Sequence, residues 1–287
     1  MTTPDHNIRI GLPSKGRLSD LAIELLKEAG IRFRRQNRSL FAKVRGLPID
    51  IIFLRTDDIP VLCAEGAIDM GITGSDLVAE ANVDVDTRLS LNVGKCRLAI
   101  CVPDDLEFND PKQLDGKRIA TSFTNATKNF LAAYNATAHL VPLSGSVEIM
   151  ITLGIADVIV DLVETGSTLA ANRLKIAHEI GQYETVLIQN KQQRHSEMAQ
   201  RVIRRLEGVV IARGYSLLEY NIPQENLEAA LKITPGFKSP TITPLDDQQW
   251  SAVRVMVKSS EITTVMDQLE EIQASAILET PINNCRL

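Results

Sequence analysis

The residues best suited to chemistry lie near the middle of the chain, where the apolar segment ADVIVDLV runs into ETGSTL. Gly166 would let the backbone approach an anion closely, and Thr165, Ser167 and Thr168 offer hydroxyl and N–H donors. A helix is expected to begin at about Thr168, and a helix N-terminus favours negative charge. On composition alone, an ordinary strand-to-helix turn with a Thr or Ser cap explains the segment equally well.

Two carboxylates flank this turn. Asp161 and Glu164 are placed to bind ribose hydroxyls or a magnesium ion, because carboxylates are hard oxygen ligands. The turn has neither the GxxxxGK[ST] spacing of a P-loop nor the GxGxxG spacing of a dinucleotide fold. Neither of those nucleotide sites is therefore predicted.

A basic loop follows the first expected strand, IRIGL from Ile8. Lys15 and Arg17 flank Gly16 at the carboxyl end of this strand, where open α/β sheets bind ligands. Two cations suit a polyphosphate, and Arg17 has the geometry to grip it through two hydrogen bonds. A solvated basic turn remains the alternative interpretation.

The segment IDMGITG is a third candidate. Asp69 enters it, and Gly71, Thr73 and Gly74 would form a second anion-binding turn before a helix opened by Ser75. Taken alone, a simple capped turn is the more probable interpretation.

Other polar residues are assigned structural roles. Thr124 is expected to cap one helix, and Glu148 to act as a capping-box residue of the helix-like segment GSVEIMITLG. The histidines have no spacing that suggests a triad or a metal site, so all are treated as structural or surface residues: His6, His139, His178 and His195.

The elements that must position these residues alternate between strand-like and helix-like segments, which predicts parallel sheets. We expect one lobe in residues 1–94, with residues 181–206 returning to it, and a second lobe in residues 95–180. A short helix is expected from Ile59 to Ala67. A basic helix from about His195 to Leu206 would lead into residues 207–287, whose βαββαβ order is the ferredoxin-like pattern.

Chain length, net charge and composition limit the classes of function that the protein can have. The chain has 287 residues, a net charge of −5 and 44% hydrophobic residues, which favours two or three globular domains and argues against a nucleic-acid or anionic membrane partner. Neither a secretory signal nor a membrane span is evident. The four cysteines form no CxxC pair, so buried free thiols in a cytoplasmic protein are expected.

Ordered segments along the whole chain resemble the ATP phosphoribosyltransferase family. They are GLPSKGRLSD, FLRTDDIP, IDMGITGSDLV, CRLAICVP, KRIATSF, LSGSVEI, DLVETGSTL, ITPGFKSPTITPL and SAILETPINNCR. The resemblance implies a bilobal, type II periplasmic-binding-protein-like α/β core with a C-terminal ferredoxin-like regulatory domain. It also implies that adenine N1 of ATP attacks C1 of phosphoribosyl pyrophosphate, with Mg²⁺, in the first step of histidine biosynthesis.

The resemblance assigns roles to particular residues. The donor, phosphoribosyl pyrophosphate, would be bound by Asp161, Glu164, Thr165, Gly166, Ser167, Thr168 and Leu169. ATP would be bound by Lys15, Gly16, Arg17, Asp69, Thr73 and Gly74, with Lys15, Arg17 and Asp161 as the catalytic set. Mg²⁺ would contact Asp161 and Glu164, mainly through pyrophosphate.

The C-terminal module resembles a histidine-sensing domain that gives feedback inhibition. Its pocket would be lined by Asn221, Phe237, Ser239, Thr241 and Ala276. Asn221 stands where a relative has Asp, and an amide lacks the charge that would pair with the amino group of histidine. A homo-oligomer, from dimer to hexamer, is implied.

Two other functions are compatible with this sequence. A bilobal protein can bind or sense a small molecule without catalysis. A subunit of the short form of the family is active only with a separate regulatory protein, but the residues after Tyr215 argue against that form.

Overall fold

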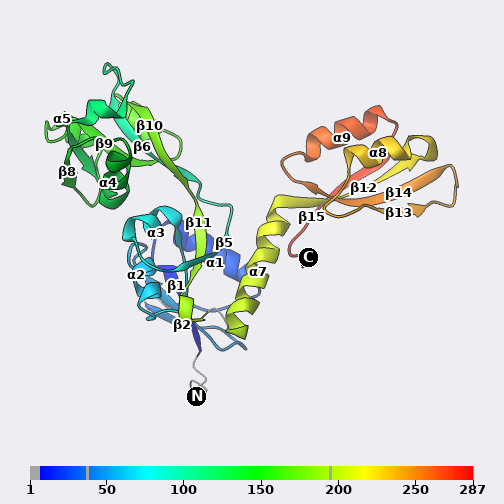
Figure 1. Cartoon of the computed structure of the whole chain (residues 1–287). Helices are drawn as coiled ribbons and strands as arrows, with labels where there is room; N and C mark the ends of the chain where they lie inside the picture. Colours follow the sequence, from blue (N-terminus) through cyan, green and yellow to red (C-terminus); the bar gives the residue numbers. More distant parts are fainter. Residues whose placement is uncertain (1–6, 37–38, 194–195, 287) are drawn as a thin grey trace. The chain divides into compact units, whose positions relative to one another are not determined.

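The computed structural model describes residues 7–36, 39–193 and 196–286, so the histidines at positions 6 and 195 lie outside the described residues. The chain divides into two compact units, one of residues 1–24 and 32–200, the other of residues 25–31 and 201–287. Figure 1 shows the helices and strands of each unit.

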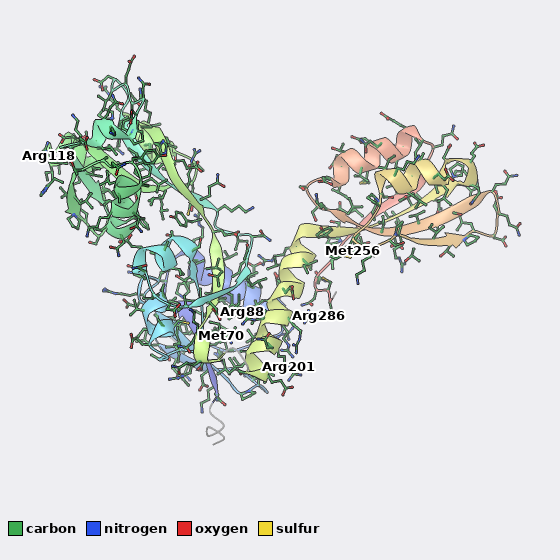
Figure 2. The ribbon with its side chains drawn as sticks, in the orientation of Figure 1. Met70, Arg88, Arg118, Arg201, Met256 and Arg286 are labelled. Carbon is green, nitrogen blue, oxygen red and sulfur yellow. The ribbon has the colours of Figure 1, made fainter. Side chains whose placement is uncertain are left out.

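Lobe I of the first unit is built on a six-stranded sheet in the order β2-β3-β1-β4-β11-β5. Parallel pairing joins β1 to β3 and β4, whereas β11 runs antiparallel between β4 and β5. Arg88 of β5 and Gln189 of β11 are joined by a 2.9 Å hydrogen bond, and Met70 of β4 is fully buried (Figure 2). The strands are β1 (Ile8–Pro13), β2 (Phe41–Lys43), β3 (Ile49–Leu54), β4 (Met70–Gly74), β5 (Asp86–Ser90) and β11 (Thr185–Gln189).

The helices of the first sheet follow its parallel strands. They are α1 (Arg17–Glu28), α2 (Asp58–Ala64) and α3 (Ser75–Ala81). The helix expected from Ile59 to Ala67 is shorter at its end, because Gly66 adopts φ 73° and its N–H donates to Cys63 O at 3.2 Å. A glycine in the left-handed region commonly ends a helix in this way.

Lobe II is built on a five-stranded sheet in the order β10-β6-β9-β7-β8. Parallel pairing joins β7 to β8 and β9, whereas β6 runs antiparallel to both β9 and β10. The strands are β6 (Cys96–Pro103), β7 (Arg118–Thr121), β8 (His139–Pro142), β9 (Val158–Val163) and β10 (Leu174–Tyr183).

The prediction of parallel sheets holds for the βαβ strands of each lobe, β1 with β3 and β4 and β7 with β8 and β9. Both sheets are nevertheless mixed, because β2, β6 and β11 pair antiparallel with their neighbours. The two sheets share one arrangement. In lobe I, β1 lies between β3 and β4, and β11 separates β4 from β5; in lobe II, β7 lies between β8 and β9, and β6 separates β9 from β10. The fold is therefore the bilobal, type II periplasmic-binding-protein-like α/β core.

The helices of lobe II are short. They are η1 (Pro111–Leu114), α4 (Thr124–Ala133), α5 (Ile149–Thr152) and α6 (Ser167–Ala171).

Two predicted helix caps of lobe II are wrong. Thr124 is the first residue of α4 rather than its cap, and Phe123 at the N-cap gives no side-chain bond. Glu148 precedes α5 without a side-chain cap bond, and α5 spans four residues rather than the segment GSVEIMITLG.

The second unit contains a ferredoxin-like module and most of α7 (Glu197–Gly214), from Arg201 onward. Helix α7 continues eight residues past the expected end at Leu206. The module contains β12 (Tyr215–Pro223), η3 (Gln224–Asn226), α8 (Leu227–Ile233), β13 (Thr241–Pro244), β14 (Trp250–Lys258), α9 (Ile262–Glu271) and β15 (Ser275–Pro281). The order β13-β14-β12-β15 confirms the predicted ferredoxin-like pattern.

The sheet of this module has one covered and one open face. Residues of β12 alternate between buried and half-buried, and the buried ones pack with Ile262, Val265 and Leu269 of α9.

The short helix η2 (Lys191–Gln193) follows β11 in the sequence. Among the described residues of the whole chain, no helix combines the length and the apolar character required to span a bilayer.

Candidate active site

The turn after β9 has the geometry of an anion site. Gly166 adopts φ 80° immediately before α6, a conformation that glycine takes without strain. The hydroxyls of Thr165 and Ser167 lie 3.1 Å apart on the same side of the turn. The helix begins at Ser167, one residue earlier than expected.

A cavity of about 430 Å³ opens over this turn. The structure brings together every residue predicted for the donor site, and adds Cys96, Glu148, Leu162 and Val163. The predicted residues that line the cavity are Asp161, Glu164, Thr165, Gly166, Ser167, Thr168 and Leu169. Its volume is within the range of small-molecule sites.

Asp161 is a partly buried carboxyl group in this cavity. Its Oδ1 accepts a 2.8 Å hydrogen bond from the backbone N–H of Leu162. Burial raises the pKa of Asp161, the Leu162 hydrogen bond lowers it, and the negative charge of Glu148 raises it again. Glu148 was missed as a site residue, although the segment LSGSVEI that contains it was already recognised.

The basic loop of lobe I contacts Glu164, one of the residues that line this cavity, through Arg17. The guanidinium of Arg17 donates a hydrogen bond to Oε1 of Glu164. This contact raises the pKa of Arg17 through the hydrogen bond and the charge of Glu164. Lys15 is exposed beside it, and Gly16 adopts φ 85°, so the loop turns sharply before α1.

The third candidate segment is divided between the two ends of β4. Thr73 and Gly74 lie at its carboxyl end, where Thr73 Oγ1 donates to Thr56 O at 3.3 Å and a side chain on Gly74 would clash with the carboxylate of Asp76. Asp69 precedes the strand at the opposite end and is only 2% exposed.

The structure places Asp69 apart from Thr73 and Gly74, the other residues of this segment predicted to bind ATP. Its Oδ2 accepts a 2.7 Å hydrogen bond from the backbone N–H of Arg9 and lies 3.6 Å from Nε of the same residue. A buried carboxylate that is paired in this way holds β1 to β4 and does not face the loops that follow the strands.

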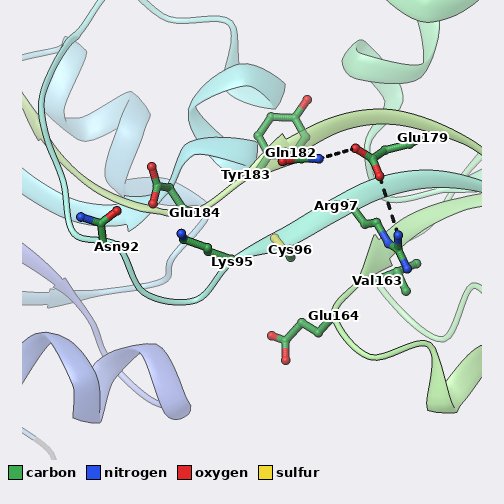
Figure 3. A pocket seen from close by; sticks show the side chains of 10 residues that line it. All are labelled: Asn92, Lys95, Cys96, Arg97, Val163, Glu164, Glu179, Gln182, Tyr183 and Glu184. Carbon is green, nitrogen blue, oxygen red and sulfur yellow. Dashed lines mark hydrogen bonds and ion pairs between the residues drawn. The ribbon is translucent and has the colours of Figure 1, made fainter. Parts of the chain in front are cut away.

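A second cavity, of about 400 Å³, lies beside the first and shares Cys96, Val163 and Glu164 with it (Figure 3). Its other lining residues come from segments that cross between the lobes: Asn92, Lys95, Arg97, Glu179, Gln182, Tyr183 and Glu184. Glu179 lies 3.8 Å from Arg97 and accepts a 2.9 Å hydrogen bond from Gln182. This cavity was not predicted, because most of its lining residues lie outside the recognised segments and come from stretches that are far apart in the sequence.

The open face of the ferredoxin-like sheet has a cavity of about 390 Å³. Three of the five residues predicted to bind histidine line it, namely Asn221, Thr241 and Ala276. Phe237 and Ser239 do not line this cavity. The ring of Phe237 packs edge-on against Tyr215 at 5.6 Å between centroids, and the Ser239 hydroxyl donates to Pro240 O at 3.3 Å.

The thiols are poor nucleophiles. Burial raises the pKa of Cys63 and of Cys101 to about 12, and that of Cys96 in the donor cavity to about 11. Among the residues that the structure describes, no group of three or more His, Cys, Asp or Glu side chains is arranged to hold a metal ion.

Fold and site together define a two-lobed α/β protein with a turn suited to phosphorylated small molecules. A family model described as ATP phosphoribosyltransferase matches residues 55–208, and one described as HisG, C-terminal domain, matches residues 212–284. The chain therefore belongs to the ATP phosphoribosyltransferase family, in the long form that carries the C-terminal domain.

Individual relatives agree with this assignment. An ATP phosphoribosyltransferase of Rhodopirellula baltica is 66% identical over 99% of this chain and 95% of its own length. One from Yarrowia lipolytica is 43% identical over 99% and 98% of the two chains. A solved ATP phosphoribosyl transferase (HisG:HisZ) complex from Thermotoga maritima matches 71% of this chain and 98% of its own, with 28% identity and a TM-score of 0.63.

The family determines the class of enzyme. The chain is a phosphoribosyltransferase, a glycosyltransferase-type enzyme that acts on small molecules in histidine biosynthesis. Enzymes of this family need a metal ion. A binding protein without catalytic activity is not favoured.

Proposed function

We propose that the donor, phosphoribosyl pyrophosphate, binds with its 5′-phosphate on the turn from Thr165 to Leu169. The observation that carries this proposal is the 430 Å³ cavity over a left-handed Gly166, which is lined by the hydroxyl-bearing residues Thr165, Ser167 and Thr168 at the start of α6. Asp161 and Glu164 would then contact the ribose hydroxyls or orient the metal ion.

The acceptor, ATP, is assigned to the lobe I side. Lys15, Gly16 and Arg17 would bind its phosphates or the departing pyrophosphate, with the turn at Thr73 and Gly74 beside them. Thr73 would contribute backbone rather than its hydroxyl, because the side chain is fully buried and already bonded. The 400 Å³ cavity beside the donor turn offers space for a second substrate.

This arrangement suits a transfer that requires little proton chemistry. Adenine N1 has a free lone pair at neutral pH, so no side chain has to deprotonate it before it attacks C1. The new N1–C1 bond forms as the bond from C1 to pyrophosphate breaks. The chain then contributes mainly by aligning two anionic substrates and neutralising the charge on the leaving group.

Mg²⁺ is the metal ion that best fits the donor cavity. Mg²⁺ usually binds one or two carboxylates together with substrate phosphates, rather than a complete protein cage. Asp161 and Glu164 offer that number of carboxylates, and the described residues lack a three-ligand cluster. Bound there, Mg²⁺ would neutralise charge on the pyrophosphate, while Asp161 and Glu164 would orient it.

The test is turnover by the purified chain with ATP, phosphoribosyl pyrophosphate and Mg²⁺, measured by the ultraviolet absorbance of phosphoribosyl-ATP. Ser167→Ala should weaken donor binding, because it removes a hydroxyl from the turn. A folded chain that binds one small ligand tightly without turnover would instead support a sensing protein. Ser260→Ala, at an exposed residue outside the cavity, serves as a control.

We also propose that histidine inhibits the enzyme at the 390 Å³ cavity of the ferredoxin-like module, with Asn221, Thr241 and Ala276 as contacts. Phe237 and Ser239 would contribute only if their segment moves toward this cavity. The proposed assembly is a homo-oligomer, from dimer to hexamer. The proposed compartment is the cytoplasm, in which the four free cysteines would remain reduced.

A further inference from the structure

Helix α3 of lobe I contacts helix α4 of lobe II through the side chain of Glu80. The carboxylate accepts hydrogen bonds from the backbone N–H of Asn125, at 2.9 Å to Oε1 and 3.0 Å to Oε2, and from that of Ala126, at 3.0 Å to Oε2. In return, Nδ2 of Asn125 donates a 2.7 Å hydrogen bond to the backbone carbonyl of Glu80. The contact is therefore reciprocal.

Glu80 supplies a cap that α4 lacks in its own sequence. The first N–H groups of a helix have no partner within the helix, and Phe123 at the N-cap of α4 provides no side-chain acceptor. A carboxylate is well suited to this position, because it also interacts favourably with the positive end of the helix dipole. A side chain of lobe I thus caps the N-terminus of a helix in lobe II.

An apolar contact accompanies the cap. Leu77 lies three residues before Glu80, so both side chains are on one face of α3. Leu77 packs against the lobe II core cluster that contains Leu98 and Phe130. One face of α3 therefore contacts lobe II through both an apolar and a charged side chain.

The position of this contact relates it to both proposed substrate sites. Helix α3 begins immediately after Gly74, in the turn assigned to the acceptor. Helix α4 follows β7, and Thr121 at the end of β7 pairs with Val160 of β9, the strand that leads to the donor turn. The contact therefore joins an element of the acceptor side to an element of the donor side.

We propose that Glu80 is a positioning residue that holds lobe I and lobe II at the separation needed for adenine N1 to reach C1 of the donor. Glu80 contacts neither substrate; it acts through α4. An error of about 1 Å in the alignment of reacting atoms can lower a rate about a hundredfold, so a cap that fixes the lobes affects the chemical step. The inference depends on the donor site proposed at Glu164 to Leu169.

The experiment compares Glu80→Ala, Glu80→Gln and Asn125→Ala in the full chain. For each variant, kcat, both KM values, the Kd for phosphoribosyl pyrophosphate without ATP, and hydrogen exchange at the amides of Asn125 and Ala126 are measured. Glu80→Ala should lower kcat about tenfold or more and speed exchange at both amides. Donor Kd should change less than about twofold, because the donor turn is intact.

Two variants provide controls for this result. Glu80→Gln keeps one acceptor oxygen and should recover part of the lost kcat. Glu65→Ala makes the same kind of change elsewhere in lobe I, at an exposed side chain that forms no hydrogen bond or ion pair among residues 7–36, 39–193 and 196–286, and should leave all readouts unchanged.

Asn125→Ala decides the question if Glu80→Ala does not fold. It removes only the reciprocal bond, should lower kcat about two- to fivefold, and should add nothing to Glu80→Ala in the double variant. Two results for Glu80→Ala would overturn the proposal. In the first, kcat stays within about twofold of wild type while both amides exchange faster. In the second, kcat falls and the donor Kd rises together. A wrong donor site would appear separately, as unchanged donor binding by Ser167→Ala.

Discussion

Arg17 at the start of α1 donates a hydrogen bond to Glu164 at the start of the donor turn. Residues 147 positions apart in the sequence, one in each lobe, are thereby brought into contact. Both are exposed, 79% for the side chain of Arg17 and 45% for that of Glu164. An exposed ion pair adds little to stability. In the proposed function, an anionic substrate would take the place of Glu164 as the partner of Arg17.

The first prediction concerns Arg17. Arg17→Ala should lower kcat/KM about tenfold or more, because it removes a charge-assisted hydrogen bond to a phosphate group. Arg17→Lys should restore only part of the activity, since an ammonium lacks the bidentate geometry. Steady-state kinetics with each substrate varied in turn provide the measurement; unchanged kcat and KM values in Arg17→Ala would exclude the role.

The second prediction concerns Gly166. Replacement by Ala places a side chain on a residue with φ 80°, at a cost of about 1–2 kcal/mol in backbone strain. The new side chain would not clash with its neighbours, since the nearest atom to its Cβ would be Val163 Cγ1 at 4.0 Å. The KM for phosphoribosyl pyrophosphate should rise while the fold persists, as judged by circular dichroism. Gly116→Ala, at a left-handed turn away from the cavity, is the matched control.

The third prediction concerns the metal ion. Chelation with EDTA should abolish turnover, and added Mg²⁺ should restore it, because the leaving pyrophosphate requires neutralisation. Asp161→Asn should raise the Mg²⁺ concentration needed for half-maximal activity. A variant with the wild-type Mg²⁺ dependence would remove Asp161 from the metal site.

The fourth prediction concerns Asp157, which forms a two-pronged pair with Arg118 in lobe II. Hydrogen bonds from Arg118 lower the pKa of Asp157 to about 2. The stabilising effect is therefore present above the unfolded-state pKa of about 3.9 and is lost as the pH falls through about 2.

Denaturant titrations of Asp157→Asn and wild type check this pair. The variant should be less stable at pH 7 by under about 1 kcal/mol, because more than a third of the pair is exposed to solvent. The difference should shrink as the pH approaches 2. A constant difference across this range would contradict the assignment.

The fifth prediction concerns regulation. Asn221→Asp adds a carboxylate to the cavity of the ferredoxin-like module, where it would pair with the amino group of histidine. The histidine concentration for half-inhibition should fall several-fold, and kcat without histidine should stay the same. Inhibition curves for Asn221→Asp and Asn221→Ala test this, with opposite shifts expected.

The sequence predicted the elements whose patterns are local. The apolar strand before Gly166 and the βαββαβ order of the last module needed only periodicity and turn residues. It did not reveal β10 and β11 as strands, and β10 is mostly half-buried, which leaves no clear alternation in its sequence. Their antiparallel pairing depends on how the chain crosses between lobes, which no local pattern encodes.

The donor turn was predictable for the same reason, since its residues are consecutive. Asp69 was grouped with Gly71 to Gly74 because these residues resemble a turn in the sequence, whereas they form most of the strand β4, which puts Asp69 and Gly74 at opposite ends. The cap of α4 was sought in Thr124, the nearest hydroxyl, although it comes from Glu80, 45 residues away. Contacts of this kind require the tertiary structure.

The position of β11 between β4 and β5 has a consequence for how the protein is made. Every residue of β11 is buried, yet it is synthesised only after the whole of lobe II. At ribosomal rates, the interval from Ser90 to Thr185 lasts roughly 5–20 s. The strands of lobe II are contiguous in sequence, so lobe II can complete its sheet on the ribosome while the first-made half of lobe I still exposes the edge of β4. Nascent chains of this enzyme should therefore depend on chaperones through their earlier half.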